Sequence, residues 1–288
     1  MDVSAILSPI ITIGSMGLLF GLGLGVAAKK FAVPVDERVD SIKENLPGAN
    51  CGGCGLAGCE AMAKAIVSGE SKVNACPVCS EAQIEAIAKV MGIEAQLTEK
   101  KVAVLRCKGN IENAKQKYEY AGITSCQDAH LLGGGPKLCS YGCLGYGSCI
   151  EQCQFGAMSM KDGIPVIDRE KCVGCGACEK KCPRQVIHLI PVNSSYHVNC
   201  ISKDKGKEVK AGCKVGCIGC GLCVKQCDVG AIVLRDNYAE IDANLCVACG
   251  KCSTKCPTKA ISNLLDEFKK EYVPFVAKNQ LSNQDISL

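Results

Sequence analysis

The chain has 288 residues, of which 25 are cysteine and none is tryptophan, with 4% aromatic residues and a formal charge of +4. A disulfide framework is disfavoured, because such frameworks belong to short secreted chains and because an odd cysteine count leaves one thiol over. Nucleic acid is disfavoured as a partner, because neither a stripe of arginine and lysine nor an aromatic platform accompanies the small positive charge.

Residues 5–28 contain no charged side chain. As a helix this stretch would reach about 36 Å, enough to cross a hydrocarbon core of about 30 Å with some tilt. A cleaved signal peptide, the alternative, would carry positive charge before the apolar run, whereas here Asp2 precedes it and Lys29 and Lys30 follow it. We therefore predict a single-pass transmembrane anchor over residues 1–30 in the cytoplasmic (inner) membrane. The positive-inside rule places the rest of the chain on the cytoplasmic side.

A small helical domain is predicted over residues 31–98, beginning with a polar linker at 33–41. Helices are expected at 60–66, which is rich in small residues, and at 81–91, where apolar side chains recur at helical spacing. Cysteines spaced C-x2-C-x4-C-x16-C would bind one 4Fe-4S cluster, and the glycines between them would let the backbone wrap around it. The four ligands would be Cys51, Cys54, Cys59 and Cys76. Cys79 is an alternative to Cys76, which we favour.

Residues 99–125 are interpreted as a linker segment. Within it, residues 101–106 read KVAVLR and predict a short strand that leads to Cys107. Further on, three glycines at 133–135 precede Pro136. This glycine run lacks the Lys-Ser/Thr pair of a phosphate-binding loop, so we interpret it as a turn.

Three cysteine runs of the ferredoxin type follow. Each has the spacing C-x2-C-x2-C-x3-C, in which three thiolates bind one cubane and the fourth reaches a neighbouring cluster. The runs begin at Cys172, Cys217 and Cys246, and the first and third are followed by proline. Structural zinc is the alternative, but it would use paired Cys/His knuckles and the chain has only three histidines. Three such runs in one chain favour iron–sulfur clusters over zinc.

The C-terminal part of the chain repeats itself at a period of 74 residues. Residues 126–190 (the first repeat) align with residues 200–264 (the second repeat) without a gap, which predicts two tandem ferredoxin-like modules that each bind two clusters. Tyr146 occupies the position that corresponds to Cys220. A phenolate replaces a thiolate poorly, so we expect Cys139 to supply the missing ligand.

Crossed ligation then gives two ligand sets in each repeat. In the first repeat they are Cys139, Cys143, Cys149 and Cys182, and Cys153, Cys172, Cys175 and Cys178. In the second repeat they are Cys217, Cys220, Cys223 and Cys256, and Cys227, Cys246, Cys249 and Cys252. With the N-terminal site, these sets predict five 4Fe-4S clusters in an α+β chain that ends in a tail over residues 265–288. Five cysteines remain, interpreted as buried thiols or relics of the duplication because their spacing does not support a sixth site: Cys79, Cys107, Cys126, Cys200 and Cys213.

Over nearly its whole length the chain resembles the B subunit of the ion-translocating Rnf complex, a ferredoxin:NAD+ oxidoreductase. The resemblance is carried by the apolar N-terminal anchor, the segments PGANCGGCGLAGC and GGGPKLCSYGCLGYGSC, and the ferredoxin repeats, of which the second marks the longer form of the family. It implies an iron–sulfur subunit whose electron donor is reduced soluble ferredoxin. The electrons would pass to partner subunits that bind flavin and NAD, within a membrane assembly that exports Na+ or H+.

Other functions stay open. The cysteine runs alone would also suit the iron–sulfur subunit of a membrane hydrogenase or formate dehydrogenase. A membrane redox sensor usually needs a single labile cluster, so five clusters argue against that role. The sequence shows no dinucleotide-binding fingerprint and no catalytic His/Asp pair. We therefore expect no catalytic residue in this chain, only electron transfer.

Overall fold

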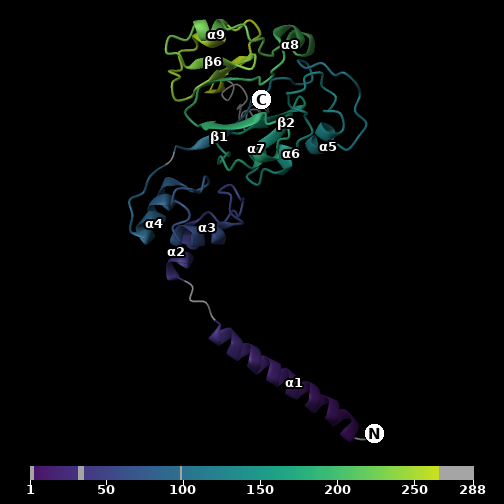
Figure 1. Cartoon of the computed structure of the whole chain (residues 1–288), viewed down its shortest axis with the longest axis vertical. Coiled ribbons are helices and arrows are strands. Elements are labelled where there is room, and N and C mark those ends of the chain that lie inside the picture. Colours follow the sequence, from purple (N-terminus) through teal and green to yellow (C-terminus); the bar gives the residue numbers. More distant parts are fainter. Residues whose placement is uncertain (1–2, 32–35, 98, 266–288) are drawn as a thin grey trace, which may run out of the picture.

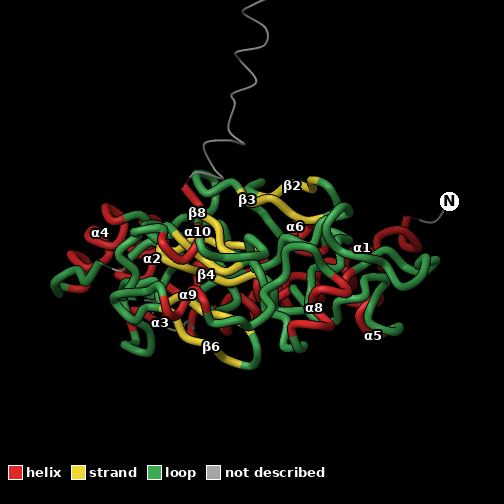
Figure 2. The backbone as a smooth tube through the Cα atoms, turned by 90° about the horizontal axis from the view of Figure 1, so that it is seen from above, coloured by secondary structure: helices red, strands yellow, loops and turns green. Residues whose placement is uncertain are grey.

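The computed structural model describes residues 3–31, 36–97 and 99–265, with side chains from residue 12 onward. Within these residues, short helices and four antiparallel strand pairs are set among long loops, which gives an α+β architecture (Figures 1 and 2). The tail predicted over residues 265–288 lies, apart from Leu265, outside the described residues.

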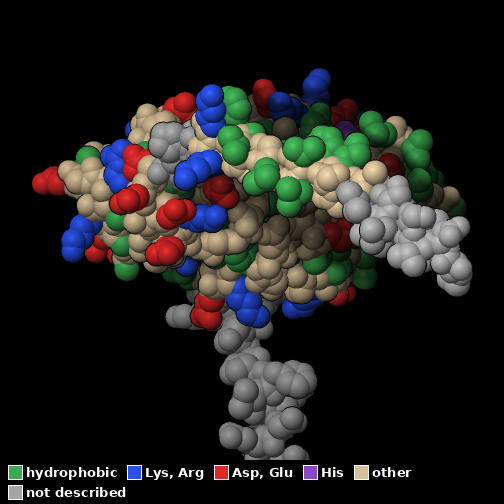
Figure 3. All heavy atoms as spheres, turned by 90° about the horizontal axis from the view of Figure 1, so that it is seen from below, with side chains coloured by type: hydrophobic (Ala, Val, Ile, Leu, Met, Phe, Trp, Pro, Cys, Tyr) green, Lys and Arg blue, Asp and Glu red, His purple; other side chains and the backbone are tan. Residues whose placement is uncertain are grey.

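The N-terminal helix α1 (Val3–Lys30) lies apart from the other helices and strands (Figure 1). Its part Thr12–Lys30 is long and apolar enough to span a membrane. The apolar side chains there are exposed, Leu19 to 69% and Phe20 to 64%. In Figure 3 hydrophobic side chains gather over this helix, whereas acidic and basic side chains intermingle elsewhere on the same face. Such a helix is stable where lipid or protein covers it, which fits a membrane-anchored protein.

Three helices follow in the N-terminal domain: α2 (Glu37–Asn45), α3 (Cys59–Val67) and α4 (Glu81–Met91). The helices predicted at 60–66 and 81–91 are confirmed, but the linker predicted at 33–41 is wrong in its second half, where α2 begins. The Asp36 carboxylate accepts a hydrogen bond from the Arg38 amide at 2.9 Å and so caps the start of α2.

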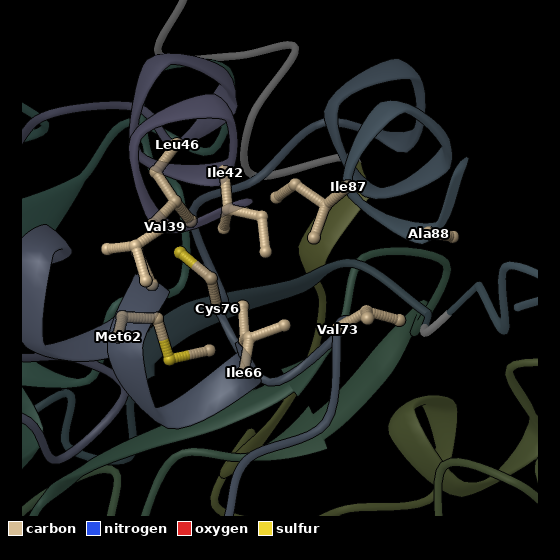
Figure 4. Packing of buried hydrophobic residues seen from close by; sticks show 10 residues of the cluster. Val39, Ile42, Leu46, Met62, Ile66, Val73, Cys76, Ile87 and Ala88 are labelled. Atoms are coloured by element: carbon tan, nitrogen blue, oxygen red, sulfur yellow. The ribbon is translucent and has the colours of Figure 1, made fainter. Parts of the chain in front are cut away.

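The core of this domain lies between the three helices. Ile42 of α2, Ile66 of α3 and Ile87 of α4 are almost completely buried, as is Met62. Figure 4 shows these side chains converging, with Cys76 placed among them. The helices therefore pack into a hydrophobic cluster that includes one of the predicted ligands.

The strands form four antiparallel ladders: β1 (Lys101–Leu105) with β4 (Ile187–Pro191), β2 (Met158–Lys161) with β3 (Ile164–Ile167), β5 (Tyr196–Val198) with β8 (Ile261–Asn263), and β6 (Ile232–Arg235) with β7 (Tyr238–Ile241). The hairpins β2–β3 and β6–β7 are equivalent in the two repeats. The strands β4 and β8 are also equivalent, and each pairs with a strand that precedes its repeat. The predicted strand at 101–106 is confirmed as β1, which pairs with β4 and buries Val102 completely, so this part of the predicted linker packs onto the first repeat.

Four short helices carry a cysteine as their second residue: α6 (Ser148–Glu151), α7 (Ala177–Lys181), α9 (Leu222–Lys225) and α10 (Lys251–Thr254). Each begins after a glycine in the left-handed conformation, for example Gly147 at φ +80° and Gly221 at φ +72°. Within each repeat the two helices pack together, α6 against α7 and α9 against α10. The remaining short helices are α5 (Cys126–Leu131) and α8 (Gly206–Gly212).

Candidate cluster-binding sites

Two of the predicted ligand sets each line one cavity. Cys153, Cys172, Cys175 and Cys178 surround a cavity beside β1 and β4 in the first repeat. Cys217, Cys220, Cys223 and Cys256 surround a cavity of the second repeat, at the position that corresponds to the other cluster of the first repeat. Each set combines three thiols of one cysteine run with a fourth from the other run of the same repeat, which is the arrangement that crossed ligation requires.

The other cavity of the first repeat differs from the prediction in one residue. It is lined by Cys126, Cys143, Cys149 and Cys182, while Cys139 lines a separate, larger cavity. We therefore replace Cys139 by Cys126 in this set.

The reason for the difference lies around Tyr146, the residue that stands where the second repeat has Cys220. Tyr146 packs against the buried cluster of Cys126, Ala129 and Leu144. The Cys126 amide donates to the Ser148 hydroxyl at 2.9 Å, which fixes the start of α5 beside α6. A thiol from α5, that of Cys126, therefore lines the cavity on the side where Tyr146 provides no sulfur.

The remaining set of the second repeat is Cys227, Cys246, Cys249 and Cys252. Cys252 is buried at the start of α10, and burial together with the charges of Cys246 and Cys249 raises its pKa. The Cys227 sulfur accepts a hydrogen bond from the Ala231 amide at 3.2 Å. These contacts place three of the four thiols near one another and give the fourth a backbone donor.

In the N-terminal domain the structure gathers Cys54, Cys59, Cys76 and Cys79. The Cys79 thiol donates a hydrogen bond to the Cys76 sulfur, which lowers the pKa of Cys76. Cys76 is also the more buried of the two thiols, with 8% exposure. Both facts favour Cys76 as the ligand and Cys79 as a supporting donor.

Cys51, the first predicted ligand of the N-terminal site, lies toward the first repeat. Burial raises the pKa of Cys175, and the nearby charge of Cys51 adds to this shift. A Cβ at the neighbouring Gly53 would stand 2.7 Å from the Cys175 carbonyl oxygen. The N-terminal site and one site of the first repeat are therefore in direct contact.

Backbone amides donate to several of these sulfurs. Ala103 donates to Cys172 at 3.4 Å, and Ala260 donates to Cys256 at 3.3 Å. Hydrogen bonds of this kind stabilise the negative charge of a thiolate that binds a cluster and tune the cluster's reduction potential. These backbone amide donors are therefore placed as expected for sulfurs that bind a metal as thiolates.

Burial raises the pKa of Cys143 to about 12, that of Cys178 to about 12 and that of Cys223 to about 11, because a thiolate loses its hydration there. Such thiols stay protonated at neutral pH unless a metal replaces the proton. Positive iron at these positions would supply the charge that the surroundings do not.

The thiols of these sets do not form a compact site for a single metal ion in the described part of the chain. Within the described ranges, no three His, Cys, Asp or Glu side chains converge as closely as a single metal ion requires. Thiolates on zinc lie about 3.8 Å apart, because four bonds of about 2.3 Å point to the corners of a tetrahedron. A cubane keeps its four thiolates farther apart, so cysteine sets without such a compact group are compatible with 4Fe-4S clusters.

Comparison with known proteins gives the same chemistry. Residues 165–188 match the family "4Fe-4S binding domain", residues 216–260 match "4Fe-4S dicluster domain", and residues 46–78 match the family described as "Putative Fe-S cluster". These three matches cover parts of the N-terminal domain and of both repeats.

Three curated relatives align with 87 to 90% of the chain. The B subunit of the Na(+)-translocating ferredoxin:NAD(+) oxidoreductase complex of Acetobacterium woodii is 46% identical, and the alignment covers 78% of it. The B subunit of the ion-translocating oxidoreductase complex of Methanosarcina acetivorans is 43% identical over 98% of its length. The B subunit of the proton-translocating ferredoxin:NAD(+) oxidoreductase complex of Clostridium ljungdahlii is 44% identical over 89% of its length. The chain therefore belongs to the family of B subunits of ion-translocating oxidoreductase (Rnf) complexes, as an iron–sulfur electron-transfer subunit.

Proposed function

We propose that this chain is a membrane-anchored electron relay. It accepts electrons from reduced soluble ferredoxin and passes them to flavin-binding subunits on the path to NAD, and this flow drives the translocation of Na+ or H+. The names of the relatives support this role, since two of them are ferredoxin:NAD(+) oxidoreductase subunits. One of these is named for sodium and the other for protons, so either ion is compatible with the family.

The relay would consist of five 4Fe-4S clusters, which supply reversible one-electron transfer when bound. The N-terminal domain would hold one through Cys51, Cys54, Cys59 and Cys76. Each repeat would hold two, with Cys126 in place of Cys139 in the first. The protein's part is to fix the clusters close together, to bury them and to donate amide hydrogen bonds to their ligands.

One observation carries the proposal: the ligand loops of different sites touch one another. Gly53 lies against Cys175, which joins the N-terminal site to the first repeat. Within the repeats, α6 packs against α7 and α9 against α10, and each of these helices carries a ligand thiol. Neighbouring clusters would therefore be close enough to exchange electrons without movement of the chain.

The anchor sets the side of the membrane on which the relay works. We propose that α1 crosses once, with Lys29 and Lys30 at its cytoplasmic end, where positive residues accumulate. All candidate ligands follow this point in the sequence. They would then stand in the reducing compartment where soluble ferredoxin is found.

The test uses the full complex in membranes. Cys54→Ala and Cys223→Ala, made separately, each remove a ligand of a different site, and the oxidation of reduced ferredoxin coupled to NAD reduction is measured. We expect a loss of roughly tenfold or more in at least one variant, since removing a ligand breaks the relay. Glu70→Ala and Val229→Ala, at exposed positions of the same two regions, are the matched controls. Wild-type rates in both cysteine variants would refute the relay.

A further inference from the structure

We propose that Cys107, Cys139, Cys200 and Cys213 form a sixth 4Fe-4S site between the two repeats. All four line one cavity of about 390 Å³, and none of them belongs to the five sets described above. Cys107 comes from the segment that precedes the first repeat, Cys139 from the first repeat, and the other two from the second repeat. This inference deepens the proposed relay, on which it rests for the supply of iron and electrons.

The separations of the Cys107 sulfur from those of Cys139 and Cys213 have upper bounds that a cubane can bridge. A Cβ at Gly142 would stand 3.5 Å from the sulfurs of both Cys107 and Cys139, so these two atoms are separated by no more than twice that distance. A Cβ at Gly109 would stand 3.4 Å from the Cys107 sulfur and 4.0 Å from the Cys213 sulfur. Two glycines without side chains thus keep open the space that the thiols surround.

Backbone amides donate hydrogen bonds to the thiols of this cavity, as they do to the predicted ligands. The Cys107 sulfur accepts hydrogen bonds from the amides of Gly109 and Cys143, each at 3.3 Å. The Cys200 sulfur accepts from the amides of Ser202 and Cys217. Donors of this kind stabilise metal-bound thiolates, as they would at Cys172 and Cys256. A relic of the duplication would have no use for two amides aimed at its sulfur.

A strip of backbone, residues 114–115, connects the two repeats beside the cavity. On one side the Lys115 amide donates to the Gly212 carbonyl at 2.9 Å, and Ala114 forms an isolated antiparallel β-bridge with Cys213. On the other side the Leu138 amide donates to the Lys115 carbonyl at 2.8 Å. The strip therefore places the neighbours of Cys139 and Cys213, which correspond to each other in the 74-residue repeat, on its two sides.

A buried cation adjoins the proposed site. Lys137 is only 6% exposed, and its ammonium group donates to the Gly109 carbonyl at 2.6 Å. Four thiolates around a cubane core leave a net charge of about −2. The buried ammonium group would offset part of this negative charge at a position that water does not solvate well.

The position of the site gives it a role in the relay. Cys107 accepts the amide of Cys143, a ligand in the first repeat, and Cys200 accepts that of Cys217, a ligand in the second. One electron would enter from one repeat and leave to the other, with no bond to the protein made or broken. The site would connect two pairs of clusters that otherwise lie in separate repeats.

The test is the iron and acid-labile sulfide content of the full-length protein, purified without oxygen in detergent. We expect about 24 of each per wild-type chain. Cys107→Ser and Cys213→Ser should each lose about four of both, or keep them with changed electron paramagnetic resonance lines, because a serine oxygen can replace a thiolate weakly. Glu112→Ala, at an exposed position near Cys107 in the sequence that does not line the cavity, should match the wild type.

Two results would overturn the sixth site. Unchanged iron, sulfide and resonance spectra in both serine variants would show that these thiols bind nothing. One zinc per wild-type chain that disappears in the variants would show a zinc site. If a serine variant does not fold, the wild type decides: about 20 irons instead of 24 refutes the sixth site and leaves the five-cluster relay intact, whereas no iron refutes both.

Discussion

The carbonyl oxygen of Cys175 lies 2.7 Å from the point that a Cβ at Gly53 would occupy. The N-terminal ligand loop and a ligand loop of the first repeat thus pack so closely that only glycine fits. This contact makes the N-terminal domain part of the relay, although α2, α3 and α4 have a hydrophobic core of their own.

Gly53→Ala should push these two loops apart without removing a ligand. We expect unchanged iron content but a weaker magnetic interaction between the two reduced clusters, because this interaction falls steeply with distance. Electron paramagnetic resonance of the fully reduced protein measures it. Gly48→Ala is the control, because a Cβ there meets nothing within 4 Å. Gly48 has a φ of +67°, so this variant strains its own backbone but does not push two loops apart. Equal spectra for Gly53→Ala and the wild type would contradict the contact.

The exchange of Cys139 for Cys126 in the first repeat predicts a specific rescue. Cys126→Ser should lose about four iron atoms per chain. Adding Tyr146→Cys should restore them, because it recreates the thiol that the second repeat has in Cys220. The same addition should not rescue Cys139→Ser. Rescue of Cys139→Ser by Tyr146→Cys would instead support the assignment made from spacing alone.

Acid should lower the stability of the fold through His188. Burial, followed by the charge of Arg106, lowers the pKa of this histidine below its usual 6.5, although Glu179 opposes the shift. Its Nε2 atom is buried without a hydrogen-bond partner in the described part of the chain. The unfolded chain therefore takes up a proton more readily than the folded chain, so stability is lost as the pH falls through about 6.5.

We expect the urea midpoint of His188→Gln to fall less than that of the wild type between about pH 7.5 and about pH 6. His130→Gln, at an exposed histidine, should behave as the wild type and also corrects for acid damage to the clusters. Parallel curves for the wild type and His188→Gln would argue against a buried neutral histidine.

Removal of iron should unfold the second repeat before the N-terminal domain. The core of the second repeat contains few apolar residues besides its cysteines, namely Val198, Ile232, Ala239 and Ile261. The N-terminal domain buries a larger set that spans three helices. Where the metal holds the fold together, its binding energy is folding energy.

Hydrogen–deuterium exchange with and without an iron chelator measures this difference. We expect amides of β6 and β7 to exchange roughly tenfold faster or more after iron removal, while those of α2 and α4 change less. The strands β6 and β7 report on the second repeat, and the helices α2 and α4 report on the N-terminal domain. Equal protection of β6 and β7 in both states would mean that iron does not stabilise the second repeat.

The sequence predicted what depends on local spacing. The ferredoxin runs, the 74-residue repeat, β1 and α4 all follow from residues close together in the chain, and the structure contains them. The short helix α2 was missed because only Val39 and Ile42 mark its buried face and its cap, Asp36, lies within a polar stretch.

The choice between Cys126 and Cys139 could not be made in this way. Both precede Cys143, and loops of any shape can bring either thiol to the same cluster. The decision depends on long-range packing: Tyr146 stands beside Cys126, while the backbone strip around Lys115 draws the region of Cys139 toward Gly212. The substitution of a ligand position by Tyr146 was the one local signal, and it showed that a ligand was missing without showing which thiol replaces it.

The most direct test of the relay is to mix the isolated full-length protein with reduced ferredoxin under anaerobic conditions and to count the unpaired electrons by electron paramagnetic resonance. The account predicts that each chain takes up several electrons, which appear as interacting 4Fe-4S signals, and that the ferredoxin becomes oxidised in proportion. A protein that leaves the ferredoxin reduced and shows no cluster signal would contradict it.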